Sequence, residues 1–130
     1  MTVIYHNTRP AAEKVDKACR ARYVSKAELL SQADIVTLHV PYTPATHHLI
    51  GRAELTQMKP TAVLINTSRG GVVDPAALYQ ALKNHRIAAA ALDVTEIEPI
   101  LPDDPLLTLD NLIITPHIAS ASIQARDRMA

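Results

Sequence analysis

The sequence is poor in aromatic residues, cysteine and glycine, and each shortage excludes a type of core, cross-link or motif. It has no Trp or Phe and four Tyr among 130 residues, so the core formed by its 48% hydrophobic residues must be aliphatic. The single cysteine, Cys19, excludes a disulfide within the chain and fits a reducing compartment. The three glycines are Gly51, Gly70 and Gly71, so the sequence contains no G-x-G-x-x-G dinucleotide-binding fingerprint.

The sequence also lacks an excess of charge of either sign. Thirteen basic and thirteen acidic residues cancel, which argues against nucleic acid or an anionic membrane as a partner. No apolar run approaches the roughly 20 residues of a membrane-spanning helix. The first residues lack the pattern of a signal peptide. We therefore expect a soluble, cytoplasmic chain that forms one domain.

Short apolar segments alternate with amphipathic segments along the chain. Strands are predicted at residues 2–5, 22–24, 35–40, 62–65, 87–94 and 112–115. Helices are predicted at residues 11–21, 26–33, 51–59 and 75–84, and after a cap at Ser120 or Ser122. Cys19 has helical spacing and is expected in the core. The alternation predicts an α/β fold, with a parallel sheet that helices cover on both faces.

The most informative stretch begins with the apolar strand that ends before Asn66. Arg69 follows this strand, and two glycines lie directly behind it. Glycine permits backbone angles that other residues avoid, and it lets chain or ligand approach closely. Asp74 and Pro75 are typical of the cap and first residue of a helix. Loops that lead from a strand to a helix in this way line the ligand crevice of open α/β sheets, so Arg69 is a candidate binding residue.

Two further ionisable residues follow later strands of the predicted sheet. Glu98 lies in the loop after residues 87–94, and His117 follows the last strand. Because the carboxyl ends of parallel strands lie side by side, we expect both residues to converge with Arg69. A guanidinium group binds a carboxylate, an imidazole exchanges protons near neutral pH, and a neighbouring carboxylate stabilises the imidazolium. Spacing alone leaves open the alternative of a structural histidine and two solvated charges.

The adjacent histidines His47 and His48 suggest metal binding. However, the sequence places no cysteine or paired carboxylate near them. Metal sites need three or four such ligands. We therefore predict no metal site from the sequence.

Ordered motifs along nearly the whole chain resemble the D-2-hydroxyacid dehydrogenases. These motifs lie at residues 33–41, 43–46, 65–74, 90–94, 98–99, 105–107 and 116–120. Within the family, the chain looks most like the glyoxylate and hydroxypyruvate reductases. The resemblance implies a Rossmann-type doubly wound parallel sheet. It also implies an NAD(P)-dependent oxidoreductase that interconverts small 2-oxoacids, such as glyoxylate or hydroxypyruvate, with D-2-hydroxyacids.

The resemblance also implies a role for each candidate residue. Arg69 would bind the substrate carboxylate and polarise its carbonyl, His117 would be the acid/base, and Glu98 would be its partner. Asp93 would lie near the nicotinamide amide. The other implied cofactor contacts are Asn7, Thr8, Arg9, Val40, Pro41, Thr46, Thr67, Ser68, Arg69, His117, Ala119 and Ser120. Because the turn at residues 6–9 carries Arg9 and no acid, NADP is the expected cofactor in preference to NAD.

The sequence departs from the family at its start. The family's glycine-rich fingerprint precedes the segment that matches residues 2–5, as does its substrate domain. Residues 1–130 are therefore expected to be the C-terminal portion of a dinucleotide-binding domain, an incomplete Rossmann-type sheet that lacks its first strand. The full-length form is expected to be a homodimer. Two rival hypotheses are a non-catalytic nucleotide-binding interaction protein, like the dehydrogenase-like transcription corepressors, and an inactive truncated fragment.

We predict that these 130 residues alone bind NAD(P)H weakly or not at all and reduce no 2-oxoacid detectably. The physical reason is that the pyrophosphate would find no glycine-rich turn or helix N-terminus to bind. The measurement is NADPH oxidation with glyoxylate or hydroxypyruvate. Turnover by a purified, monodisperse sample would refute the prediction.

Overall fold

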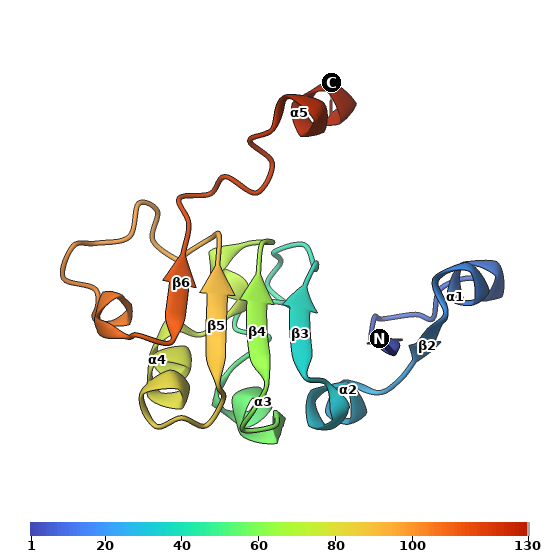
Figure 1. Ribbon diagram of the computed structural model, residues 1–130, viewed down its shortest axis with the longest axis horizontal. Coiled ribbons are helices and arrows are strands. Elements are labelled where there is room, and N and C mark those ends of the chain that lie inside the picture. The colour runs from blue at the N-terminus through green and yellow to red at the C-terminus, as the bar shows by residue number, and fades with distance from the viewer. Residues whose placement is uncertain (130) are drawn as a thin grey trace.

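A computed structural model describes residues 1–129 of the chain, which form two parallel sheets (Figure 1). A two-stranded sheet pairs β1 (Val3–Tyr5) with β2 (Ala21–Tyr23). A four-stranded sheet has the order β3 (Ile35–Leu38), β4 (Val63–Asn66), β5 (Ala89–Leu92) and β6 (Leu112–Ile114). Each predicted strand is present, and most are shorter than predicted.

Helices connect the strands as the alternating pattern predicted. They are α1 (Glu13–Cys19), α2 (Lys26–Gln32), α3 (Arg52–Gln57), α4 (Pro75–Lys83) and α5 (Ile123–Met129), with 3-10 turns η1 (Gly70–Val72) and η2 (Pro105–Thr108). Local capping explains where several begin. The Asp74 carboxylate accepts from Ala76 N and Ala77 N at 2.9 and 3.0 Å, ahead of Pro75. At α5 the cap is Ser122, whose hydroxyl accepts from Ala125 N at 3.1 Å.

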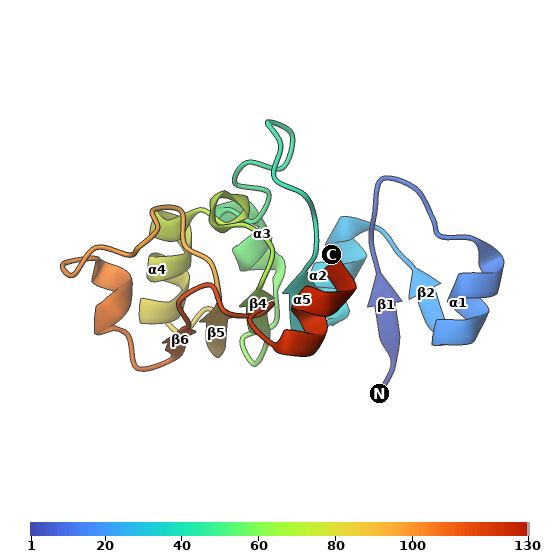
Figure 2. The same ribbon diagram turned by 90° about the horizontal axis from the view of Figure 1, so that it is seen from above.

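An aliphatic core lies between the four-stranded sheet and helices α2, α3 and α4. These helices all lie on the same side of the sheet (Figure 2). Leu30, Leu55 and Leu78 on these helices belong to one buried cluster with Leu64 in β4, and each is at most 1% exposed. Burying a leucine side chain stabilises the fold by about 1.5–3 kcal/mol. The predicted aliphatic core is therefore confirmed.

The opposite face of the four-stranded sheet has no helical cover within residues 1–129. Ile35 in β3 and Ile113 in β6 point to this face and are 58% and 67% exposed. The sequence predicted helices on both faces, and the described part of the chain supplies them to one. Alternation along the sequence gives the number of crossovers but does not say which face each helix covers.

The prediction for Cys19 is wrong, because its side chain is exposed. Helix α1 packs against the narrow β1–β2 sheet, which stands apart from β3 in both views (Figures 1 and 2). A two-stranded sheet offers little surface behind which a side chain can be buried. Among the described residues, no helix is both long and apolar enough to cross a membrane.

Candidate functional site

An open pocket lies at the carboxyl edge of the four-stranded sheet. Its lining comes from the loops after β3, β4, β5 and β6, namely Tyr42, Arg69, Gly70, Gly71, Thr95, Glu96, Glu98 and His117. The three ionisable residues that the sequence singled out therefore face one space. Their convergence follows from the parallel strand order, since four successive strands end at the same edge.

A buried amide shapes the loop that presents Arg69. Asn66 ends β4 and is 0% exposed. Its Nδ2 donates to Arg69 O at 3.0 Å, while its Oδ1 accepts from Ser68 N at 3.0 Å and Ser68 Oγ at 2.8 Å. The exposed Arg69 guanidinium donates one hydrogen bond, to Ser68 O at 2.7 Å, and has further N–H donors for an anion. The sequence analysis did not assign Asn66 a role, although a polar residue ending a buried strand was a usable signal.

The two glycines behind Arg69 are needed for close approach. A Cβ on Gly70 would collide with the backbone of Thr95 in the loop after β5, and one on Gly71 would lie 2.7 Å from the Tyr42 ring. Within residues 1–129 no glycine has a positive φ, so the special backbone angles considered from the sequence are not used here. Gly70 lets the Arg69 loop and the Glu98 loop touch. Tyr42 is a pocket residue that the sequence analysis did not single out.

Glu98 and His117 form a direct hydrogen bond. His117 Nδ1 lies 2.8 Å from Glu98 Oε2, and the second carboxylate oxygen, Oε1, accepts from Thr95 N at 3.1 Å. The His117 bond lowers the pKa of the Glu98 carboxyl, assisted by the Thr95 N–H and by the positive charges of His117 and Arg69. A carboxylate held in this way fixes the orientation of the imidazole ring.

Asp93 holds the turn that carries His117. This buried carboxylate at the end of β5 accepts from the Thr115 hydroxyl, and from Ile118 N and Ala119 N at 2.9 and 2.8 Å. The Thr115 bond, and then the two N–H groups, lower the pKa of Asp93. His117 takes a left-handed backbone angle, φ 55°, inside this turn. The Asp93 carboxylate is directed to the Thr115 hydroxyl and to the chain's own N–H groups, and its expected contact with the nicotinamide stays a prediction.

The other expected cofactor residues fall into two groups. The first group lies in the loops at the carboxyl ends of the four-stranded sheet. It comprises Val40, Pro41 and Thr46 after β3, Thr67 and Ser68 after β4, and Ala119 and Ser120 after β6. The Thr46 hydroxyl donates to Pro41 O at 2.7 Å and thereby braces its own loop. The second group, Asn7, Thr8 and Arg9, is exposed after β1 in the other sheet, and neither group is among the residues that line the pocket.

Comparison with known proteins places the chain in a family. Residues 1–119 match the model of the D-isomer specific 2-hydroxyacid dehydrogenase, NAD binding domain. The chain is 52% identical over 130 residues to a glyoxylate reductase of Korarchaeum cryptofilum, covering 100% of this chain and 39% of that protein. It is 46% identical over 127 residues to a glyoxylate/hydroxypyruvate reductase B of an Enterobacter species, covering 98% of this chain and 39% of that protein.

A solved structure shares the fold. The D-mandelate dehydrogenase of Rhodotorula graminis superposes with a TM-score of 0.90 at 37% identity, covering 96% of this chain and 36% of that one. The family resemblance and the Rossmann-type fold class predicted from the sequence are thus confirmed. The chain spans about two fifths of the length of these relatives.

We predict that Gly70→Ala destabilises the chain by about 1–3 kcal/mol, the usual cost of forcing extra atoms into a packed position. The new methyl group would push the Thr95 backbone away from the Arg69 loop. Urea denaturation measures the change. The matched control is Gly51→Ala, where a Cβ would meet His48 O at an ordinary 3.6 Å. Equal unfolding free energies for the two variants would contradict the close-approach role of Gly70.

Proposed function

The chain belongs to the family of D-isomer specific 2-hydroxyacid dehydrogenases, and we propose that this protein interconverts small 2-oxoacids and D-2-hydroxyacids. Reduction of glyoxylate or hydroxypyruvate is the proposed reaction, as the names of two relatives suggest. The observation that carries the proposal is the 2.8 Å bond between His117 and Glu98 in a pocket that also holds Arg69.

Each of these side chains has a chemical task in the proposed reaction. Arg69 binds the carboxylate of the 2-oxoacid, because a guanidinium has paired N–H donors that match two carboxylate oxygens. His117 uses Nδ1 for the bond to Glu98, so its other ring nitrogen, Nε2, is the one that gives a proton to the substrate oxygen. Glu98 orients the ring and stabilises its protonated form.

The residues at the carboxyl edge of the sheet suit a nicotinamide dinucleotide. A bound nicotinamide supplies the hydride for the substrate carbonyl carbon. Supporting this assignment, Pro41, Thr67 and Ser120 are exposed at the ends of three of the four strands, where ligands bind in open α/β sheets. Asp93 is proposed to help the cofactor by keeping the turn at residues 117–119 in place.

The arrangement of the two sheets supports the proposed domain assignment. Doubly wound nucleotide-binding sheets place their first strand in the middle of the order. In the described residues β1 and β3 each have an unpaired edge, and they belong to separate sheets (β3 is labelled in Figure 1 and β1 in Figure 2). We assign residues 1–130 to the C-terminal portion of a dinucleotide-binding domain, in which one further strand between β1 and β3 would join the two sheets.

A chimera tests the proposed activity. Residues 1–130 would replace the matching segment of the Korarchaeum cryptofilum glyoxylate reductase, to which they are 52% identical. The folded chimera should reduce glyoxylate, and His117→Ala should lower its kcat by about 10²–10⁴-fold while cofactor binding persists, since it removes proton transfer. A chimera with native circular dichroism and bound cofactor but no turnover would refute the proposal and would favour a non-catalytic nucleotide-binding role.

We predict that Glu98→Gln in this chimera moves the pH profile for reduction toward lower pH. Reduction requires protonated His117, so activity falls as pH rises. The bond to His117 lowers the pKa of Glu98, so the carboxylate in turn favours the protonated ring, and its removal should move the fall in activity to lower pH. The measurement is kcat/KM against pH, with Glu13→Gln in the distant α1 as the control. An unshifted profile for Glu98→Gln would mean that the pair does not work together in catalysis.

We predict a preference for NADPH that depends on Arg9. The exposed guanidinium after β1 would pair with the 2′-phosphate, and the turn at residues 6–9 has no acid to repel it. Because hydrogen bonds to charged groups contribute about 1.5–3 kcal/mol, Arg9→Gln should raise KM for NADPH at least about tenfold. KM for NADH should stay the same, as should both values in the control Arg52→Gln. If the chimera without the Arg9 substitution had a higher kcat/KM with NADH than with NADPH, the predicted preference would be wrong.

A further inference from the structure

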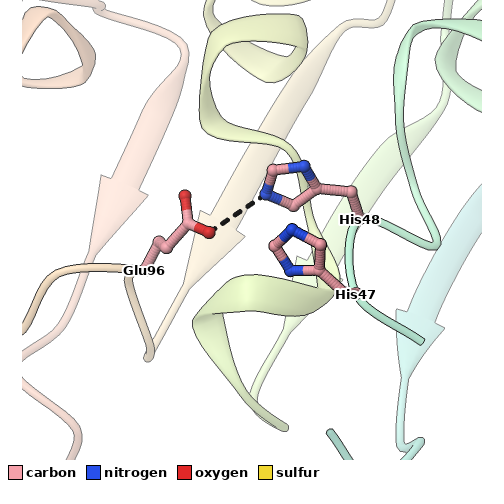
Figure 3. A group of neighbouring side chains, drawn as sticks. All are labelled: His47, His48 and Glu96. Carbon is pink, nitrogen blue, oxygen red and sulfur yellow. Dashed lines mark hydrogen bonds and ion pairs between the residues drawn. The ribbon is translucent and has the colours of Figure 1, made fainter. Parts of the chain in front are cut away.

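Two adjacent histidines and one glutamate meet beside the pocket, although they come from different loops. His47 and His48 follow β3, and Glu96 follows β5 (Figure 3). His48 Nε2 lies 3.0 Å from Glu96 Oε1, and one ligand atom from each of the three side chains lies within 4.8 Å of the others. The adjacent histidines suggested metal binding from the sequence, but nothing there placed Glu96 with them, because Glu96 is 48 residues from His48.

The loop that carries the histidines is held by its own hydrogen bonds. His48 N donates to Gly71 O at 2.8 Å, and the next turn is fixed by Ile50 N donating to Val72 O at 3.0 Å. His48 has a left-handed backbone angle, φ 50°, which turns its ring toward the loop after β5. The backbone positions of both imidazoles are therefore set before any ligand arrives.

A second contact orients the other ring. His47 Nδ1 lies 3.0 Å from the hydroxyl of Tyr42, and the His47 ring stacks on His48 with centroids 3.8 Å apart. Metal-ligating histidines commonly use one ring nitrogen in a hydrogen bond that fixes the ring, which leaves the other nitrogen for the metal. The Tyr42 contact supplies such a bond to His47.

We propose that His47, His48 and Glu96 bind a divalent transition metal ion of the zinc class. Two imidazoles and a carboxylate suit Zn²⁺ and Co²⁺, whereas Mg²⁺ and Ca²⁺ prefer oxygen ligands alone. Bonds of about 2.0–2.2 Å to one ion place the donors roughly 3–4 Å apart, so the rings need only a small rotation to close on it. Water completes the coordination, because the three side chains are partly or fully exposed.

An ion at this position would tie two pocket loops together. Glu96 lines the pocket, and two residues later in the same loop Glu98 holds His117. The ion would join the loop after β5, which carries Glu96, to residues 47–48 in the loop after β3. It would replace the single His48–Glu96 hydrogen bond that now joins their side chains. Since a ligand that binds the folded state alone stabilises it, zinc should raise the melting temperature of the chain.

The competing explanation is an ion pair between His48 and Glu96 without a metal, in which His47 has no part. The two explanations differ in stoichiometry and in which variants matter. A metal site takes up one equivalent of ion and needs all three side chains. This inference does not rest on the proposed function, because metal binding is measured without substrate or cofactor.

Calorimetric titration of the metal-free full chain with Zn²⁺ tests the site, and Co²⁺ absorption reports its coordination. We expect one equivalent of each ion to bind, with at least tenfold weaker binding in His48→Gln, Glu96→Gln and His47→Gln. The control is His39→Gln, which changes an exposed histidine that is hydrogen-bonded to Thr37 in the same part of the chain. This variant should bind both ions as tightly as the unsubstituted chain does. Far-UV circular dichroism confirms that each variant keeps its fold.

Three results would overturn the proposal. The first is the absence of stoichiometric binding to the folded chain. The second is binding that survives both His48→Gln and Glu96→Gln, since the ion would then be held by other groups. The third is binding that weakens equally in the His39→Gln control.

Discussion

The parallel pairing of β4, β5 and β6 is the constraint on which the rest of the site depends. Asn66, Leu92 and Ile114 lie in one row across these strands. All three strands therefore end at the same edge of the sheet, and the loop after each strand carries one of the ionisable residues Arg69, Glu98 and His117. Arg69 and His117 are far apart in sequence, and the parallel strand order brings both of them to one pocket with Glu98.

Two buried polar side chains hold in place the loops that the strand register brings together. Asn66 and Asp93 are the buried polar residues of the described part of the chain, and both sit where a strand gives way to a loop. A buried polar group is costly unless its hydrogen bonds are satisfied, and here the partners are loop groups beside Arg69 and His117. The same bonds that make burial tolerable thus fix the loops from which the reactive side chains project.

Local features of the structure were predictable from the sequence, and contacts between distant segments were less so. The alternation of elements and the caps at Asp74 and Ser122 follow from a few neighbouring residues, and they are confirmed. Exposure of Cys19 depends on the small size of the sheet behind α1, which no local pattern reveals. The approach of Glu96 to the histidines likewise depends on where two separate loops end. The proposed roles of Arg69, Glu98 and His117 rest on the family motifs together with the strand order.

The central claim is that Glu98 acts through His117. A double-mutant cycle on kcat/KM for glyoxylate reduction, measured in the chimera at one pH, tests this most directly. If the claim holds, Glu98→Gln lowers kcat/KM when His117 is present and has almost no further effect in the His117→Ala background. Equal losses from Glu98→Gln in both backgrounds would show that the two residues act independently, and would contradict the account.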